Sequence, residues 1–169
     1  LDGMIHAICA DDTVGVCAGK VGHELWAFMP RSQLGNVPTN TTRLDGSPKV
    51  ADVFGYFYGS STKEYKTVLT FANGTNDAPA TYAIDITDPT TPKVMWEHAT
   101  PGGGANLAIG VVNVPSTGIT NLTFIQTSTG EGGPAGMYLA AIETATGDAL
   151  WTQTQQYKPA RGLVDGSAA

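Results

Sequence analysis

The chain has 169 residues, 41% of them hydrophobic, which is enough for one domain-sized core, but no apolar run approaches the about 20 residues of a membrane-spanning helix. Its formal net charge of −6 argues against nucleic-acid binding, because proteins that bind phosphate backbones gather Lys and Arg on one surface. Only 14% of the residues are charged, whereas Gly, Pro and Thr are abundant, a mixture that favours strands and turns over helices.

Short apolar segments alternate with turn residues along the chain. Their lengths and their content of β-branched and aromatic residues are typical of strands. In chain order the expected strands are 4–8, a segment around Trp26, 47–54, 65–72, 82–86, a segment around Trp96, 106–114, 121–129, 137–142 and a segment around Trp151.

Three hairpins in this series share one sequence pattern. In each, an apolar strand leads through a turn to a second strand with a tryptophan near its start: Trp26, Trp96 and Trp151. The hairpins share the same order of strand, turn and tryptophan-bearing strand. They differ in turn length, which is the variation that loops tolerate best. Two further strands precede the second and the third hairpin. The repeating unit is therefore four short antiparallel strands, with a tryptophan near the start of the fourth.

Units of this kind are typical of β-propeller blades. We expect an all-β chain with essentially no helix, forming a partial β-propeller of four-stranded antiparallel blades. Because about four blades are needed to close a ring, we also expect the chain to be a piece of a longer polypeptide. The expected boundaries are the second half of one blade at 1–30, an interblade loop at 31–43, complete blades at 44–100 and 101–157, and the start of the next blade at 158–169.

The repeated tryptophans have a structural and a functional interpretation. A large ring on the outer strand can wedge between neighbouring blades and bury about 200 Å². It can also serve as a stacking platform for a sugar or a planar cofactor. One tryptophan at the same position of each repeat favours the blade-docking role for Trp26, Trp96 and Trp151.

Motifs for catalysis and cofactor binding are incomplete. The glycine-rich segment 130–136 leads into a strand, whereas a dinucleotide-binding loop opens a helix. The phrase GVCAGK at 15–20 is one residue short of a phosphate-binding loop. His23-Glu24 has no second histidine four residues later, as a zinc protease requires. We therefore assign no catalytic, cofactor-binding or metal-binding residue and expect no enzymatic activity.

The remaining polar candidates have simpler structural interpretations. The histidines His6, His23 and His98 are scattered along the chain and are interpreted as solvated or strand-filling residues. Asp45 and Asp165 each precede Gly-Ser and are interpreted as turn residues before a strand. One carboxylate at each turn is far short of the oxygen ligands that calcium needs.

Five phrases together carry a family likeness: DGMIHAI with GHELWAFMP, LDGSPKVADVF, YKTVLTF, TYAIDITDPTTPKVMWE and ETATGDALW. They resemble the C-terminal propeller of the PilY family, proteins of type IV pili that serve in pilus biogenesis, surface sensing and adhesion. The resemblance covers nearly the whole chain. The chain departs from the family in lacking its acidic calcium loop, since the closest segment, 85–88, has too few oxygen ligands. No cofactor is expected within these residues, and calcium would lie elsewhere in the parent protein.

The resemblance implies a non-enzymatic structural or interaction module at the pilus tip or the outer cell surface, exported through the periplasm. Its partners would be minor pilins or other pilus-tip proteins, a host or abiotic surface, and the remaining blades of the parent chain. The segment 31–43 would be presented from a rigid scaffold. Hairpins ending in TG-x-x-LW also occur in quinoprotein dehydrogenases and in an outer-membrane assembly scaffold of the same propeller type, and these remain alternatives.

Both cysteines lie in the long turn of the first hairpin. In an exported protein, as the resemblance implies, Cys9 and Cys17 would form a disulfide, which would offset about 2–3 kcal/mol of the entropy lost on ordering the turn. In a cytosolic protein the two residues would be reduced and packed between strands. A metal site is disfavoured because further ligands are lacking nearby. The same two residues are not adjacent, unlike the cysteines that conventionally accompany quinoprotein chemistry.

Overall fold

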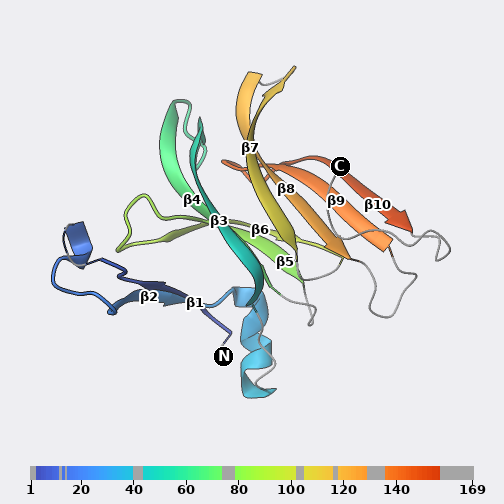
Figure 1. Ribbon diagram of the computed structural model, residues 1–169. Helices are drawn as coiled ribbons and strands as arrows, with labels where there is room; N and C mark the ends of the chain where they lie inside the picture. Colours follow the sequence, from blue (N-terminus) through green and yellow to red (C-terminus); the bar gives the residue numbers. More distant parts are fainter. Residues whose placement is uncertain are drawn as a thin grey trace.

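In the part of the chain that the structure describes, ten strands form three antiparallel sheets, so the expectation of an all-β chain is confirmed. Figure 1 shows the sheets following one another across the molecule in chain order. The described strands do not close into a ring, and the propeller architecture remains a prediction. The computed structural model describes residues 3–11, 13, 15–39, 44–73, 79–101, 105–115, 118–128 and 136–156.

Each sheet keeps its strands in the order of the chain, as a simple meander. The N-terminal hairpin contains β1 (Ile5–Ile8) and β2 (Glu24–Phe28), joined by a connection with the short 3-10 helix η1 (Gly15–Cys17). The central sheet contains β3 (Leu44–Tyr56), β4 (Lys63–Asn73), β5 (Ala80–Asp85) and β6 (Lys93–Ala99). The C-terminal sheet contains β7 (Asn106–Val114), β8 (Gly118–Ser128), β9 (Gly136–Glu143) and β10 (Ala149–Gln156).

The last two strands of every sheet share one register. In each of the three hairpins the tryptophan lies opposite an alanine, and the residue just before the tryptophan is left out of the ladder as a bulge. The three hairpins that the sequence aligns on their tryptophans therefore have the same backbone geometry. The opposed pairs are Ala7 with Trp26, Ala83 with Trp96 and Ala141 with Trp151.

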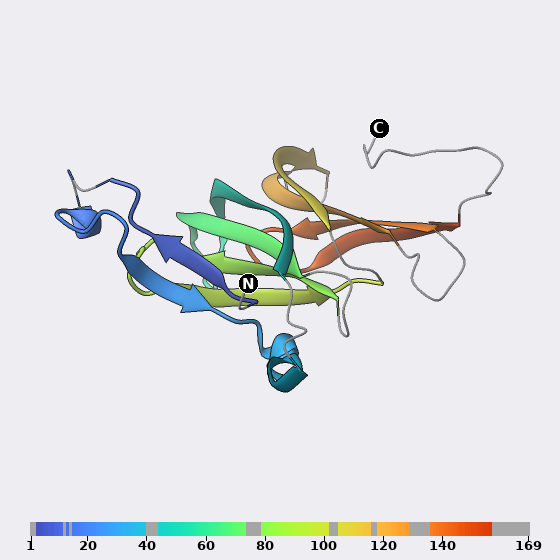
Figure 2. The same cartoon turned by 60° about the horizontal axis from the view of Figure 1, so that its bottom comes forward.

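Among the described residues, two hydrophobic cores lie between consecutive sheets. Figures 1 and 2 show the backbone of these sheets from two directions. Strand β5 contributes to both cores because its side chains alternate between the two faces of the central sheet. The N-terminal core contains Leu69, Phe71, Ala80, Tyr82 and Ile84 of the central sheet, with Ile5, Trp26 and Phe28 of the hairpin packed on them. The C-terminal core includes Val53, Val68, Ala83 and Trp96 of the central sheet and Leu107, Ile125, Tyr138, Ala140 and Ile142 of the C-terminal sheet.

The segment 31–43, expected as a loop, contains a helix that the sequence does not predict. Arg31–Thr39 forms the nine-residue 3-10 helix η2, and residues 40–43 lie outside the described part of the chain. A side-chain hydrogen bond joins Ser32 Oγ and Tyr82 Oη at 2.6 Å, which holds the helix on the central sheet. None of the described helices is long and apolar enough to cross a membrane.

Candidate functional site

Aromatic side chains occupy the outer face of the β3–β4 hairpin, where an antiparallel sheet that meets water usually carries polar residues. Phe54 lies opposite Tyr65 and Tyr56 lies opposite Lys63. The rings of Phe54 and Tyr65 are 4.7 Å apart. The Lys63 ammonium lies 5.8 Å from the Phe54 ring and 5.1 Å from the Tyr56 ring, within cation–π distance of both. We call these four residues the aromatic surface.

The alternation of side chains along β3 produces this surface. Val53 and Phe57 point inward and are buried, whereas Phe54 and Tyr56 point outward and are exposed. Further along the same face of β4, Leu69 is covered by the N-terminal hairpin. The aromatic surface is thus the uncovered continuation of a face that is buried nearer the hairpin.

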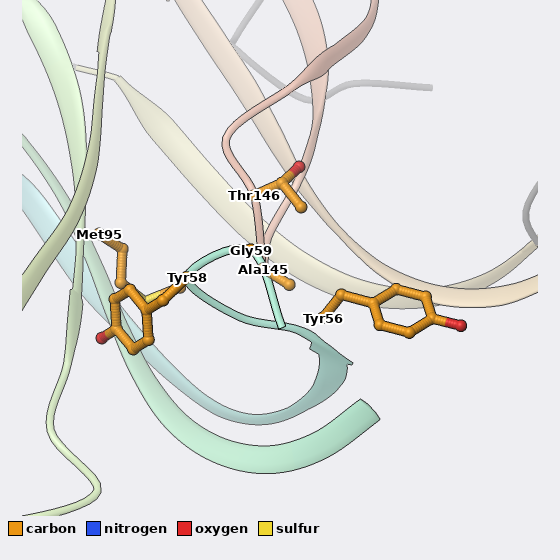
Figure 3. A pocket seen from close by; sticks show the side chains of 6 residues that line it. All are labelled: Tyr56, Tyr58, Gly59, Met95, Ala145 and Thr146. Atoms are coloured by element: carbon orange, nitrogen blue, oxygen red, sulfur yellow. The ribbon is translucent and has the colours of Figure 1, made fainter. Parts of the chain in front are cut away.

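A pocket of about 160 Å³ lies beside the turn that joins β3 to β4. Figure 3 shows Tyr58 and Met95 together on one side of the turn, while the Tyr56 ring points away on the other side. The pocket is lined by residues of the central sheet and of the connection between β9 and β10, so it lies where the central and C-terminal sheets meet. Its lining residues are Tyr56, Tyr58, Gly59, Met95, Ala145 and Thr146.

Tyr58 is held in an unusual backbone conformation. Its φ of 54° is the one positive value among the non-glycine residues that the structure describes. The phenolic oxygen donates a hydrogen bond to Asp85 Oδ2 at 2.9 Å, and Lys66 Nζ lies 3.5 Å from the same oxygen. Burial and this hydrogen bond with Asp85 raise the pKa of Tyr58 above its ordinary value. Tyr58 therefore stays neutral and remains a donor to the carboxylate.

The carboxyl group of Asp85 is buried and yet ionised. Burial by itself raises its pKa, but hydrogen bonds from Thr87 and from Tyr58, together with the nearby Lys66 ammonium, lower it below the ordinary value. The negative charge is thus fixed at the end of β5 and anchors the β3–β4 turn. This network gives the aromatic surface a rigid support.

The side chains of the aromatic surface suit contact with a partner. Aromatic faces backed by an ammonium group suit flat or apolar partner groups, and aromatic residues are enriched at protein interfaces. Within the described residues, no group of three or more His, Cys, Asp or Glu side chains is arranged to hold a metal ion.

Cys9 and Cys17 form a disulfide with an S–S distance of 1.98 Å, as the sequence led us to expect. The bond closes the connection between β1 and β2. Backbone hydrogen bonds tie the same connection, because Gly22 N donates to Cys9 O and Cys9 N donates to His23 O. Covalent and hydrogen-bonded links therefore both join described residues of this connection.

The three tryptophans lie at equivalent positions but in different surroundings. Trp26 Nε1 donates to the carbonyl oxygen of Pro89 at 3.0 Å, and Trp96 Nε1 donates to that of Thr144 at 2.9 Å. In both cases the acceptor lies in the connection between the third and fourth strands of the next sheet. Trp151, in contrast, is exposed.

The histidines do not form a cluster. His6 is hydrogen-bonded to Glu24 across the N-terminal hairpin, and His23 is exposed in the β1–β2 connection. His98 Nε2 lies 2.9 Å from Tyr138 Oη at the contact of the two larger sheets, and burial lowers its pKa. Asp45, expected in a turn before a strand, instead lies within β3 opposite Ala72, and Asp165 is outside the described residues.

The aromatic residues of β3 and β4 are not among the sites expected from the sequence. Their signal is the spacing of two between Phe54 and Tyr56, which places both aromatic side chains on one side of a strand. The sequence pattern does not show which side is covered, because that depends on how far the N-terminal hairpin extends over the sheet.

Comparison with protein-family models, curated proteins and solved structures finds no match. The likeness to PilY proteins therefore rests on the quoted sequence phrases.

Proposed function

We propose that the chain is a non-enzymatic interaction module of a PilY-like protein associated with type IV pili, acting in pilus biogenesis and surface adhesion. The observation that carries the proposal is the aromatic surface, in which Phe54, Tyr56 and Tyr65 are exposed around Lys63. Contiguous apolar groups on a protein surface are typical of interaction sites. The partner is another pilus-tip protein, a host surface or an abiotic surface.

The rigidity of the support favours this role. The surface belongs to two long paired strands, and the turn between them is anchored through Tyr58 and Asp85. Aromatic side chains on such a support lose little conformational freedom on binding, which favours affinity. The pocket beside the β3–β4 turn, of about 160 Å³, is smaller than the roughly 300–1,000 Å³ typical of small-molecule sites, so the proposal rests on the aromatic surface and not on this pocket.

The repeated architecture supports the partial β-propeller as the parent fold. The three hairpins share one register, and consecutive sheets contact one another through the same tryptophan position. On this proposal the strands within 44–100 and within 101–157 are two complete blades, and the N-terminal hairpin is the second half of another. The remaining blades belong to the parent chain.

The Cys9–Cys17 disulfide supports export. Disulfides persist in the periplasm and outside the cell, whereas cytosolic thiols are kept reduced. The module therefore functions at the outer cell surface or the pilus tip after passing through the periplasm.

Adsorption to a polystyrene-coated sensor, and binding to a panel of immobilised neutral glycans, test the proposal. We expect the parent chain to bind at least one of these probes and the double variant Phe54→Ser/Tyr65→Ser to lose most of that binding. The matched control, Val111→Ser/Ile119→Ser, removes two other exposed apolar side chains and should bind like the parent. Equal binding by the parent and the Phe54/Tyr65 variant would contradict the proposed surface.

A further inference from the structure

Polar groups flank the rings of the aromatic surface along the β3–β4 hairpin. Three successive cross-strand pairs share the outer face of this hairpin: Asp52 with Thr67, Phe54 with Tyr65, and Tyr56 with Lys63. At one end, Asp52 Oδ1 accepts a hydrogen bond from Thr67 Oγ1 at 2.8 Å. At the other end, the Lys63 ammonium lies 5.1 Å from the centre of the Tyr56 ring. The rings therefore lie between a carboxylate and an ammonium group.

The corresponding end of the β7–β8 hairpin is exposed although a four-stranded sheet lies beside it. Aligning the ladders of the two larger sheets on Ala83 and Ala141 matches Tyr65 with Ile119. Ile119 is 66% exposed and Tyr65 is 70% exposed. Figure 1 shows the β3–β4 and β7–β8 hairpins reaching past the other strands in the same direction. A further blade beside the N-terminal hairpin would therefore leave Tyr65 exposed, as the central sheet leaves Ile119.

The ammonium group of Lys63 is available to an anion. In the part of the chain that the structure describes, no carboxylate forms an ion pair with it. The adjacent Glu64 points to the opposite face of the hairpin, where it lies 3.3 Å from Lys66 Nζ. Asp52 precedes Tyr56 by four residues, which is about 13 Å along a strand. An anionic group beside the Tyr56 ring would thus meet a positive charge.

The position of the rings on a sheet face favours a sugar over a peptide or a nucleic acid. Backbone N–H and C=O groups lie in the plane of a sheet, so a peptide strand adds at an edge and finds no backbone partner on a face. Nucleic acids require several cations along their phosphates, whereas this row of pairs contains Lys63 alone. A sugar ring carries C–H groups on its faces, which suit the negative face of an aromatic ring, and hydroxyl groups at its rim.

We propose that the aromatic surface binds an acidic polysaccharide, built from sugars that carry a carboxylate, on the surface to which the protein adheres. This inference rests on the proposed function because it uses the same surface. The carboxylate of one sugar contacts Lys63 while its ring packs on Tyr56. Hydroxyl groups of a sugar further along the polysaccharide donate to Asp52. The net charge of −6 does not prevent this contact, because at physiological salt the field of distant charges is screened within about 8 Å.

Two forms of one polysaccharide test the charge requirement. Polygalacturonate and its carboxyl-reduced form have the same backbone, but hydroxymethyl groups replace the carboxylates in the second. With both immobilised at equal density, we expect the oxidised full chain to bind polygalacturonate at least about fivefold more tightly, the ratio that one favourable exposed ion pair supplies. Lys63→Gln should lose this preference. Lys49→Gln, which removes another exposed lysine of β3, is the matched control and should keep it.

The variant Phe54→Ser/Tyr65→Ser tests the contribution of the rings and should lose most binding to polygalacturonate. Circular dichroism and thermal melting establish that each variant is folded. Equal binding of the two polysaccharides by the parent, binding of neither, or a preference that survives Lys63→Gln would overturn the acidic ligand. The proposed function would still stand if polystyrene or a neutral glycan were bound through Phe54 and Tyr65. A parent chain that binds none of these probes would overturn both.

Discussion

Trp96 and Gly147 pack so closely that a Cβ atom added at Gly147 would lie 2.6 Å from Trp96 Cγ. Gly147 also has a φ of +84°, which L-residues with side chains rarely adopt. We therefore expect Gly147→Ala to lower the free energy of unfolding by about 2–4 kcal/mol, from backbone strain together with overpacking against the indole. Urea denaturation followed by tryptophan fluorescence measures the change.

A matched substitution separates these two causes. Gly118 has a similar φ of +74°, but nothing lies within 4 Å of an added Cβ. Gly118→Ala should cost about 1 kcal/mol, the strain alone. If the two variants lost the same free energy of unfolding, the contact with Trp96 would add nothing to the cost of backbone strain.

The Cys9–Cys17 bond closes a loop with a sequence separation of 8. For a loop of this length, the chain-entropy estimate predicts that its removal costs about 2–3 kcal/mol. The double variant Cys9→Ala/Cys17→Ala should therefore melt at a lower temperature than the oxidised parent. Adding dithiothreitol should lower the melting temperature of the parent and leave that of the double variant unchanged.

His98 gives the contact between the two larger sheets a dependence on pH. Burial lowers its pKa below the ordinary value of 6.5, so the unfolded state takes up a proton more readily than the folded state. Stability should decrease as the pH falls through about 6.5, and His98→Gln should flatten this slope. Tyr138→Phe removes the hydrogen-bond partner of His98 but keeps the ring that covers it. Because burial lowers the pKa of His98, this variant should keep the pH dependence of the parent. Denaturant titrations over this pH range measure both effects.

The lowered pKa of Asp88 makes the stability of the protein depend on pH in a more acidic range. Hydrogen bonds from the Thr90 and Thr91 hydroxyls and from the Thr90 amide lower its pKa from 3.8 to about 2. Because the folded-state pKa is depressed, the stabilisation is complete above about pH 4 and is lost as the pH falls toward 2. Asp88→Asn should weaken this acid dependence in thermal melts. A slope identical to that of the parent would contradict it.

The strand pattern and the alignment of the hairpins follow from the sequence. Ala-Ile before the turn and a tryptophan after it recur three times, and the structure places the alanine opposite the tryptophan each time. Such local phrases are predictive because a two-residue period fixes which side chains share a face. The pairing of Cys9 with Cys17 was also expected, because both lie in one turn and the resemblance to an exported family implies an oxidising compartment.

The helix η2 and the aromatic surface could not be predicted from the sequence in the same way. η2 contains Gly35 and Pro38, which disfavour helices, and the contact of Ser32 with Tyr82 depends on the folded central sheet. The exposure of Tyr65 depends on where the N-terminal hairpin stops, which no local pattern encodes. Both features arise from contacts between segments that are distant in the chain.

Among the described residues, the central sheet is the element shared by the two cores, and this arrangement affects how the molecule opens. Loss of the N-terminal core should free the β1–β2 hairpin, while the C-terminal core contains no described residue of that hairpin. Amide hydrogens of the hairpin should therefore exchange with solvent through a partial unfolding that leaves β4 and β8 protected. Each sheet is coupled only to its nearest neighbours, so the energetic effect of a substitution fades with the number of sheets it must cross.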